Sequence, residues 1–599
     1  MHIEDYALLS DCQGAALVSR SGSIDWLCLP RFDSSATFAR LLDPLAGHWS
    51  IAPTERAETS RQYMRDTLVI RTVFDTDTGS IALTDALLLG DNEQGHNIGK
   101  HSRHALVRRI ECLTGEVEMA MEFAPRPEYG LTTPRFTPTP GGVRSVGGEQ
   151  SLALCADTPI TIEPGGATAA FTLKPGQQTV FSLRTCSPWD PHPDPWSAAE
   201  AAQKLDDTIA AWRSWANLHQ SYEGPYRDLV LHSGRVLQGL TYAPTGAIVA
   251  APTTSLPETV GGSRNWDYRY CWVRDASLTM EALWVAACPD EAAEFFAFLG
   301  TAAGGGVSNT GLQIMYGVRG ERLLPEHELD HLAGYQESRP VRIGNGAWNQ
   351  DQLDVYGELS SAAQLLSEPI GTFDKSTATF LIDVADTAAS RWHQPDQGIW
   401  EVRGPARHMV HSKAMCWVAL DRAVQLAPKL GAGEKAAKWT ETRDEIRDAI
   451  LKRGWSESQH AFAQSFDSDE LDASTLLLAI GGFLPPTDDR MRATIEAVAE
   501  RLTDERGFVY RYRGEDGLDG HEGTFTICSF WLAQCLAMAG ELTRATELFE
   551  RIIAHANDVG LMSEEIGAQG EHVGNFPQAF THVGLINAAW AIHLAKGLA

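Results

Sequence analysis

Alternating apolar and polar residues in the first third of the chain predict β-structure. Residues 117–123 (VEMAMEF) alternate with a period of two, which is typical of a strand with one buried face. Residues 68–84 form two apolar runs around an Asp/Thr/Gly turn, and residues 171–183 are expected to form a second hairpin with Pro175-Gly176 as its turn. Because such short strands follow one another without intervening helices, we expect an antiparallel β-sandwich.

The hydrophobic period changes after Trp196. The Pro-rich segment Ser187–Trp196 separates the strands from a helical pattern, so we place a domain boundary there. In residues 491–502 and 542–552 the apolar positions recur every three or four residues, which gives each helix one apolar face. Further helices are expected to begin near Tyr226, Asp275, Gln352, Lys375, Ser412, Glu434, Asp472, Thr526 and Gln578.

These helices favour one large helical domain without a short sequence repeat. About a dozen antiparallel helices can close as a double ring, with six helices inside and six outside, and the loops would then meet at one end. An open helical array is the alternative. The expected organisation is therefore an α+β multidomain protein, with a β-sandwich over residues 1–196, a linker helix over 197–224 and the helical domain over 225–599.

The charge balance restricts the partners of the protein. The 599 residues include 49 Lys and Arg and 78 Asp and Glu, a net charge of −29, which argues against nucleic acid or an anionic membrane as a partner. We expect no signal peptide and no membrane span, because the N-terminus has no basic start followed by an apolar run, and no apolar stretch reaches about 18 residues.

The sequence also predicts neither a cofactor nor a metal. The ten cysteines are scattered without a CxxC pair or a zinc-like Cys/His spacing, which suggests free thiols and a cytoplasmic location. No phosphate-binding glycine loop follows a strand and opens a helix, so a nucleotide cofactor is not expected. Faces rich in Gly and Trp would allow a homo-oligomer.

The loops between the predicted helices are unusually rich in Trp, Tyr, Arg, Asp and Glu. A sugar ring needs this combination, because its C–H face packs on an aromatic ring and its hydroxyls bind Asp and Arg. A single residue of these types is more often a core or surface residue, so the joint occurrence carries the prediction. Five segments stand out: 265–275, 342–354, 398–404, 510–525 and 560–566.

Two carboxyl groups in these loops suit the cleavage of a glycosidic bond. The reaction needs one protonated carboxyl that gives its proton to the leaving oxygen and one ionised carboxylate that attacks or activates water. Glu401 follows Trp400, and an aromatic wall would raise the pKa of its carboxyl. Glu564 and Glu565 form a like-charge pair in a loop that starts with glycine, and one of them is a candidate base.

At these residues the chain resembles glycoside hydrolase family 15, which contains glucoamylases and a bacterial trehalase branch. The resemblance covers nearly the whole chain, and residues 8–43 (LLSDCQGAALVSRSGSIDWLCLPRFDSSATFARLLD) are similar to the opening of the trehalase-like N-terminal domain. The catalytic-domain blocks are YCWVRDASL, GIWEVRGPARHMVHSKAMCWVALDRA, EGTFTICSFWLAQCLA, GLMSEEI and GNFPQAFTHVGLINAAWAI.

The resemblance implies a β-sandwich, a helical linker and an (α/α)6 barrel that hydrolyses its substrate with inversion. Trp400-Glu401 matches the motif of the general acid, and Met562-Ser563-Glu564 matches the motif of the general base. The segment 272–275 matches a Trp-x-Arg-Asp motif that holds glucose. The sugar-binding residues implied or expected are therefore Trp272, Arg274, Asp275, Trp400, Arg511, Glu565 and Asp354.

Two departures from fungal glucoamylases affect the expected substrate. Val402 stands where those enzymes have a second acidic residue after the acid, and Glu565 stands in place of Gln after the base. Both differences favour a small α-glucoside, above all α,α-trehalose, over long starch chains. A glucoamylase or isomaltose-type exo-α-glucosidase, a disaccharide phosphorylase and a non-catalytic sugar-binding protein remain as alternatives.

Overall fold

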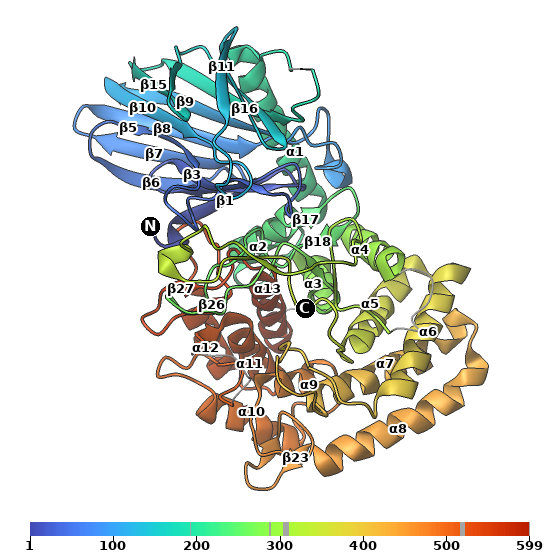
Figure 1. The fold of residues 1–599 in the computed structure, drawn as a ribbon. Coiled ribbons are helices and arrows are strands. Elements are labelled where there is room, and N and C mark those ends of the chain that lie inside the picture. The colour runs from blue at the N-terminus through green and yellow to red at the C-terminus, as the bar shows by residue number, and fades with distance from the viewer. Residues whose placement is uncertain (192, 287–288, 304–310, 515–521, 598–599) are drawn as a thin grey trace.

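The protein has a β half and a helical half. The computed structural model describes residues 1–599 except 192, 287–288, 304–310, 515–521 and 598–599. Strands β1 to β16 gather at one end, and helices α2 to α13 gather at the other (Figure 1). The long helix α1 (Ala198–His219) lies between them and begins with a capping box, in which Ser197 and Glu200 bond each other's backbone N–H.

The β half consists of two eight-stranded antiparallel sheets. The first sheet contains β1 (Tyr6–Ser10), β2 (Ala15–Ser19), β3 (Ser23–Cys28), β4 (Ala36–Phe38), β5 (His48–Pro53), β10 (Val117–Ala124), β14 (Thr161–Glu163) and β15 (Gly166–Leu173). The second contains β6 (Ala57–Tyr63), β7 (Ile70–Thr76), β8 (Gly79–Leu87), β9 (Ala105–Gly115), β11 (Arg135–Thr139), β12 (Gly142–Gly147), β13 (Gln150–Ala156) and β16 (Gln178–Cys186).

The strand patterns are confirmed, but one predicted hairpin is wrong. β10 alternates buried and exposed residues as expected, and β7 pairs with β8 across the predicted turn. Residues 171–183 do not form a hairpin, because β15 pairs with β10 and β14, whereas β16 pairs with β13 and β9 in the other sheet. The turn at Pro175-Gly176, with Gly176 at a φ of +79°, instead carries the chain between the sheets.

The helical half follows the predicted order of helices, with α4 added. Its helices are α2 (Arg227–Gly239), α3 (Val273–Ala286), α4 (Pro289–Ala303), α5 (Val355–Ile370), α6 (Lys375–Arg391), α7 (Val410–Leu430), α8 (Ala436–Arg453), α9 (Leu477–Ile480), α10 (Asp489–Arg501), α11 (Thr526–Met538), α12 (Leu542–Ile553) and α13 (Ala579–Ala595). Short paired strands connect them: β17 (Thr241–Tyr242), β18 (Ala247–Ile248), β19 (Cys271–Trp272), β20 (Met315–Tyr316), β21 (His327–Glu328), β22 (Arg342–Ile343), β23 (Trp455–Ser456), β24 (Ala461–Phe462), β25 (Thr524–Phe525), β26 (Glu565–Ile566) and β27 (His572–Val573).

The helices pack in two layers. α3, α5, α7, α9, α11 and α13 each contact the next in this order, and α13 returns to contact α3. α2, α4, α6 and α12 each pack between two neighbouring members of that series, and α8 and α10 pack against α7 and α11. The sequence accounts for the layers, because α11 and α13 are buried almost all round, whereas α12 buries only the stripe Ala545, Leu548, Phe549 and Ile552.

The two halves are joined by buried polar contacts. The indole N–H of Trp26 donates to the carbonyl of Pro252 at 2.8 Å, and Arg269 donates to the carbonyl of Ser34 at 3.0 Å. Arg61 forms a two-point contact with Asp558 at 2.8 and 2.9 Å. The first two contacts hold the segment around residues 250–270 against the β half, and the third holds the loop around Asp558.

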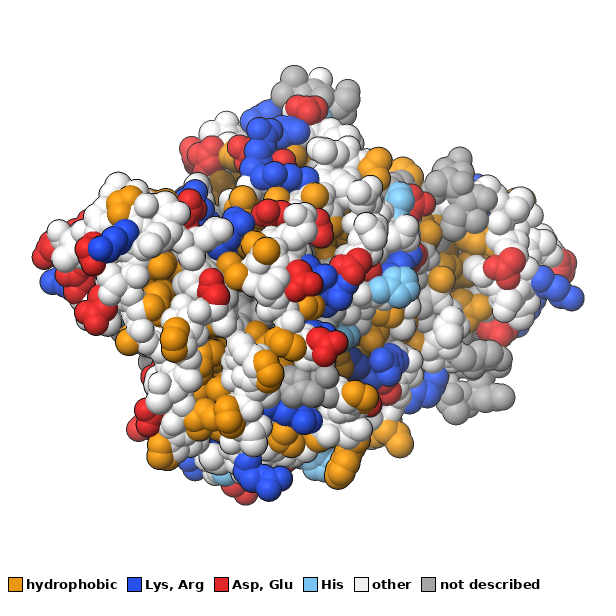
Figure 2. All heavy atoms as spheres, turned by 90° about the horizontal axis from the view of Figure 1, so that it is seen from above, with side chains coloured by type: hydrophobic (Ala, Val, Ile, Leu, Met, Phe, Trp, Pro, Cys, Tyr) orange, Lys and Arg blue, Asp and Glu red, His pale blue; other side chains and the backbone are white. Residues whose placement is uncertain are grey.

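The expected free thiols are confirmed for the described cysteines. Acidic and basic side chains are interspersed over the face seen from above (Figure 2). No helix among the described residues is long and apolar enough to cross a membrane. Every cysteine within the described ranges is free, and Cys288 lies outside them. The homo-oligomer and the cytoplasmic location stay predictions.

Candidate active site

A polar pocket opens where the loops of the helical half meet. It holds about 680 Å³ of empty space, including the open solvent at its mouth. The pocket is lined by Ala250, Glu258, Arg264, Trp266, Tyr268, Trp272, Arg274, Asp275, Ile399, Trp400, Glu401, Arg403, Arg511, Tyr512, Phe525, Gln578 and Phe580. Three of the five segments singled out in the sequence, 265–275, 398–404 and 510–525, supply lining residues. The other two, 342–354 and 560–566, contact lining residues from behind, through Arg342 on Trp266 and Glu564 on Tyr268.

One extended segment forms a wall of the pocket. Side chains of an extended chain point alternately to opposite sides. Trp266 and Tyr268 are therefore partly exposed and line the pocket, whereas Asp267 and Arg269 are buried toward the β half. Arg269 forms a bidentate pair with Asp267, with N–O distances of 2.7 and 2.8 Å, and this pair fixes the wall from behind.

Glu401 lies in the pocket between an indole and a guanidinium. The indole N–H of Trp272 donates to Oε1 of Glu401 at 2.6 Å, and Nη1 of Arg274 lies 3.8 Å from the same oxygen. The backbone of Glu401 has a φ of +58°, in the left-handed region that non-glycine residues rarely adopt. The turn that directs this side chain into the pocket is therefore strained. Burial raises the pKa of Glu401, and Arg274 and the indole N–H oppose that rise.

Arg274 is fixed at the start of α3. Its Nε donates to Asp275 at 3.0 Å, and its Nη1 donates to the carbonyl of Ile399, the residue before Trp400. The guanidinium also lies 5.8 Å from the ring centre of Phe580. Arg274 and Asp275 thus form a rigid pair of hydrogen-bonding groups beside Glu401.

Trp400 is held by a carboxylate behind it. Its indole N–H points to both carboxylate oxygens of Asp472, at 2.9 and 3.1 Å, and Asp472 is buried at the start of the segment before α9. The ring packs edge-on against Phe525, with 5.5 Å between the ring centres. The orientation of Trp400 is therefore set before any ligand enters.

Glu564 lies directly behind the wall formed by Tyr268. The hydroxyl of Tyr268 donates to Oε1 of Glu564 at 2.5 Å, and the backbone N–H of Asn575 donates to Oε2 at 3.1 Å. Burial raises the pKa of Glu564 to about 8, repulsion from Glu258 adds to the rise, and Arg511 opposes it. Glu564 is fully buried, and its contact with the pocket runs through the Tyr268 hydroxyl.

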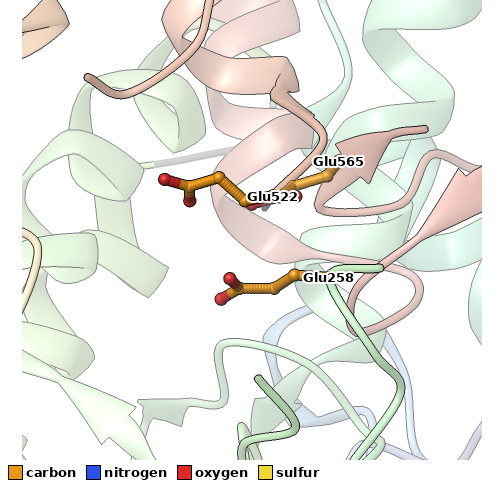
Figure 3. Close-up of side chains that lie close together, drawn as sticks. All are labelled: Glu258, Glu522 and Glu565. Atoms are coloured by element: carbon orange, nitrogen blue, oxygen red, sulfur yellow. The ribbon is translucent and has the colours of Figure 1, made fainter. Parts of the chain in front are cut away.

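Three more carboxylates surround Arg511. Oxygens of Glu258, Glu522 and Glu565 lie within 4.8 Å of one another, and Figure 3 shows Glu258 on a different segment of the chain from the other two. Arg511 contacts Glu258 at 2.9 Å and Glu565 at 3.3 Å, and it also pairs with Glu522. This spacing would suit a metal ion, but the guanidinium of Arg511 already forms ion pairs with all three carboxylates.

Three of the predicted residues do not line the pocket. Glu564 and Glu565 lie behind its wall, and Gly523 donates to Oε2 of Glu565 at 2.8 Å. Asp354 is buried before α5, where burial raises its pKa to about 7 and the nearby Arg274 opposes the rise. The other predicted residues, Glu401, Trp272, Arg274, Asp275, Trp400 and Arg511, all line the pocket.

The sequence did not single out Glu258 or Tyr268. Tyr268 lies inside a segment that the sequence did mark, but nothing in the pattern showed that it contacts Glu564, 296 positions away. Glu258 lies in a segment without aromatic residues (LPETVGG), so the criterion that found the other loops passed over it. Arg264, Gln578 and Phe580 are further lining residues outside the five segments, whereas Arg403 and Phe525 lie inside two of them but were not named as sugar-binding residues.

The helical half matches a known family model. Residues 224–590 match the model described as glycosyl hydrolases family 15, and residues 1–208 match the model described as trehalase-like, N-terminal. A trehalase of Mycolicibacterium smegmatis is 41% identical over 99% of this chain and 91% of its own length. A trehalase of Thermoplasma volcanium is 32% identical over 98% of this chain and 93% of its own length.

A solved structure shares the fold. A bacterial glucoamylase complexed with acarbose superimposes with a TM-score of 0.70, covering 100% of this chain and 94% of the glucoamylase chain. The identity of the two sequences is 14%, so this likeness concerns the arrangement of an N-terminal antiparallel sheet domain followed by a helical domain.

Proposed function

The chain belongs to the glycosyl hydrolases of family 15, and we propose that it hydrolyses α,α-trehalose to two glucose molecules. The full-length similarity to trehalases of 41% and 32% identity supports the choice of substrate. The observation that carries the proposal for this pocket is the placement of Glu401 against Trp272 and Arg274, because it presents a carboxyl group beside fixed sugar-binding groups.

Glu401 acts as the general acid in this proposal. Burial favours its neutral form, so the carboxyl holds a proton that it can pass to the bridging oxygen of the substrate. Trp272 fixes Oε1, which leaves Oε2 as the atom that carries the proton. The leaving sugar then departs as a neutral glucose molecule.

Glu564 acts as the general base. The pocket reaches Oε1 of Glu564 through the hydroxyl of Tyr268, so in this proposal the water gives its proton to that hydroxyl, which passes its own proton to Glu564. The water attacks the anomeric carbon from the face opposite the leaving sugar. Such single displacement requires carboxyl groups about 6.5–9.5 Å apart, and it inverts the anomeric configuration.

The sugar-binding groups divide between direct and supporting contacts. Arg274 and Asp275 bind hydroxyls of the glucose that is attacked, and the rings of Trp272 and Trp400 pack on its faces. Arg511 borders the same space. The buried carboxyls of Asp354 and Glu565 support this set through Arg274 and Arg511 respectively.

We propose an (α/α)6 barrel for the helical half. The closed order of contacts through α3, α5, α7, α9, α11 and α13 supports an inner ring, and the amphipathic α10 and α12 support an outer one. The corresponding domains are 1–196, 197–224 and 225–599. A cytoplasmic location belongs to the same proposal.

A product assay by NMR tests the function. Incubation with trehalose is expected to release glucose, with the attacked sugar appearing first as the β-anomer. Maltose, isomaltose and soluble starch are the comparison substrates, and a preference for any of them would assign an exo-α-glucosidase. Glucose 1-phosphate formed in phosphate buffer would assign a phosphorylase, and sugar binding without glucose release would assign a binding protein.

A further inference from the structure

Glu258 differs from the other carboxylates around Arg511 because it faces the pocket. It is 2% exposed and lines the pocket, whereas Glu522 and Glu565 are not among the lining residues. Its two oxygens have different partners, since Oε2 pairs with Arg511 at 2.9 Å and Oε1 accepts the indole N–H of Trp266 at 3.2 Å. One carboxylate therefore ties together two walls of the pocket.

Trp266 and Arg511 both depend on this carboxylate for their positions. The ring of Trp266 is covered by Arg342 and Arg403, at 4.7 and 5.0 Å from the ring centre, and its N–H is directed at Glu258. The guanidinium of Arg511 packs on Phe525, 4.9 Å from the ring centre. Loss of Glu258 would remove this acceptor from both residues, and Arg511 would keep only Glu522 and Glu565.

The charge of Glu258 also acts on Glu564. After burial, repulsion from Glu258 is the largest contribution that raises the pKa of Glu564, and it also raises the pKa of Glu565. Arg511 counteracts both effects, but it is shared with Glu522. One guanidinium thus serves several buried carboxyls, and these carboxyls compete for its charge.

We propose that Glu258 is a positioning residue of the hydrolytic centre, which seats Arg511 and Trp266 and acts on the base Glu564 through its charge. This inference rests on the proposed function. The groups that face Glu564 are Tyr268, Glu258, Arg511, the adjacent Glu565 and the backbone of Asn575. His582, which accepts from the N–H of Met562, keeps a pKa of about 3 through burial and stays neutral in the assay range.

Two variants of Glu258 separate its charge from its shape. Glu258→Gln removes the charge and keeps the length of the side chain, but it keeps only one of the two acceptor oxygens that Arg511 and Trp266 use. Glu258→Asp keeps the charge and both oxygens on a shorter side chain. The rate is measured against pH with α-glucosyl fluoride, whose leaving fluoride needs no carboxylic acid, so the acidic limb reports the ionisation of the base. Melting curves confirm that both variants are folded.

The expected result is a shift of the acidic limb in one variant only. In Glu258→Gln the limb moves to lower pH by about one unit, because a repelling charge is gone and Arg511 is free to pair with Glu564 more strongly. In Glu258→Asp the acidic limb moves by less than about half a pH unit, because the charge is kept, while kcat falls. Glu522→Gln is the matched control, since it also removes a partner of Arg511, and its shift is expected to be smaller.

The proposal is overturned if the limb of folded Glu258→Gln does not move, or if Glu522→Gln moves it as far. Failure of the proposed function would look different. Wild-type protein that hydrolyses α-glucosyl fluoride but not trehalose refutes the substrate, and the comparison of the variants can still be made. Wild-type protein inactive on both substrates refutes the hydrolytic centre, and the role of Glu258 falls with it.

Discussion

The substitution Glu401→Gln isolates proton donation from the other contacts of the pocket. The amide keeps an oxygen that can accept the indole N–H of Trp272, which lies 2.6 Å from Oε1 in the wild-type protein. It cannot hold or give the proton that the bridging oxygen of trehalose needs. Glutamine has nearly the shape of glutamic acid, so the change disturbs little besides this chemistry.

The magnitude follows from the contacts that remain. Loss of a general acid reduces the rate by about 10² to 10⁴, equivalent to roughly 3–5.5 kcal/mol of transition-state stabilisation. Arg274 keeps Asp275 at 3.0 Å, and a protonated Glu401 forms no ion pair with the guanidinium 3.8 Å away, so the amide removes no charge on which Arg274 depends. We therefore expect the loss in kcat for trehalose, with KM changed by less than about fivefold.

The assay compares two substrates in two variants. Trehalose requires protonation of its leaving oxygen, whereas α-glucosyl fluoride does not, so Glu401→Gln is expected to retain the fluoride reaction within about tenfold. Glu564→Gln is the control, because loss of the base slows both substrates. Glucose release is followed by NMR, which also identifies the first-formed anomer, and fluoride release is followed with an ion-selective electrode.

Three outcomes would refute the assigned roles. Equal losses on both substrates in Glu401→Gln would show that Glu401 does not donate the proton. Retention of the fluoride reaction in Glu564→Gln and its loss in Glu401→Gln would reverse the two roles, a result that the high pKa of Glu564 in the empty pocket makes worth checking. If α-glucose formed first, the reaction would proceed with retention, by a double displacement.

Three further predictions concern the base and the core. Glu564→Gln is expected to raise Tm at pH 9 more than at pH 5. The pKa of Glu564 is about 8 in the folded protein against the usual 4.5, so its neutral form contributes stability that is complete below about pH 4.5 and lost as the pH rises through about 8. An equal change of Tm at both pH values would contradict this. Gly574→Ala is expected to lower kcat at least about tenfold, since a Cβ there lies 2.5 Å from Oε2 of Glu564 at a φ of +74°, whereas Gly176→Ala, with a similar φ and nothing within 4 Å, should leave kcat unchanged. Asp85→Asn removes the charged partner of the fully buried Arg108, 2.8 Å away, and leaves its guanidinium with neutral acceptors only, so it is expected to cost about 3–5 kcal/mol in urea unfolding; a loss below about 1 kcal/mol would show that the pair is dispensable.

The sequence predicted local structure well where one period dominates. The alternation in β10 and the three-four spacing in α12 translate directly into one buried face each. The sequence did not predict which strands pair. The pattern of residues 171–183 is the same whether its two halves pair with each other or lie in opposite sheets. Tertiary contacts of β15 with β10 and of β16 with β9 decided that question.

The candidate site was predictable where chemistry concentrates in short segments. Trp272, Arg274 and Asp275 are neighbours in sequence, and Trp400 and Glu401 are adjacent, so their motifs are visible without a structure. The groups that control them are distant. Asp472 fixes Trp400 across 72 positions, and no spacing rule links a carboxylate to an indole so far along the chain.

The β half supports the wall of the pocket, although none of its described residues lines the pocket. The wall segment alternates, so each side chain that faces the substrate, such as Tyr268, is followed by one that faces backward, such as Arg269. Arg269 is bonded to Ser34 of the β half, and the start of the same segment is held through Trp26. A change in the β half that loosens this wall therefore displaces Tyr268, and with it the hydrogen bond that orients Glu564.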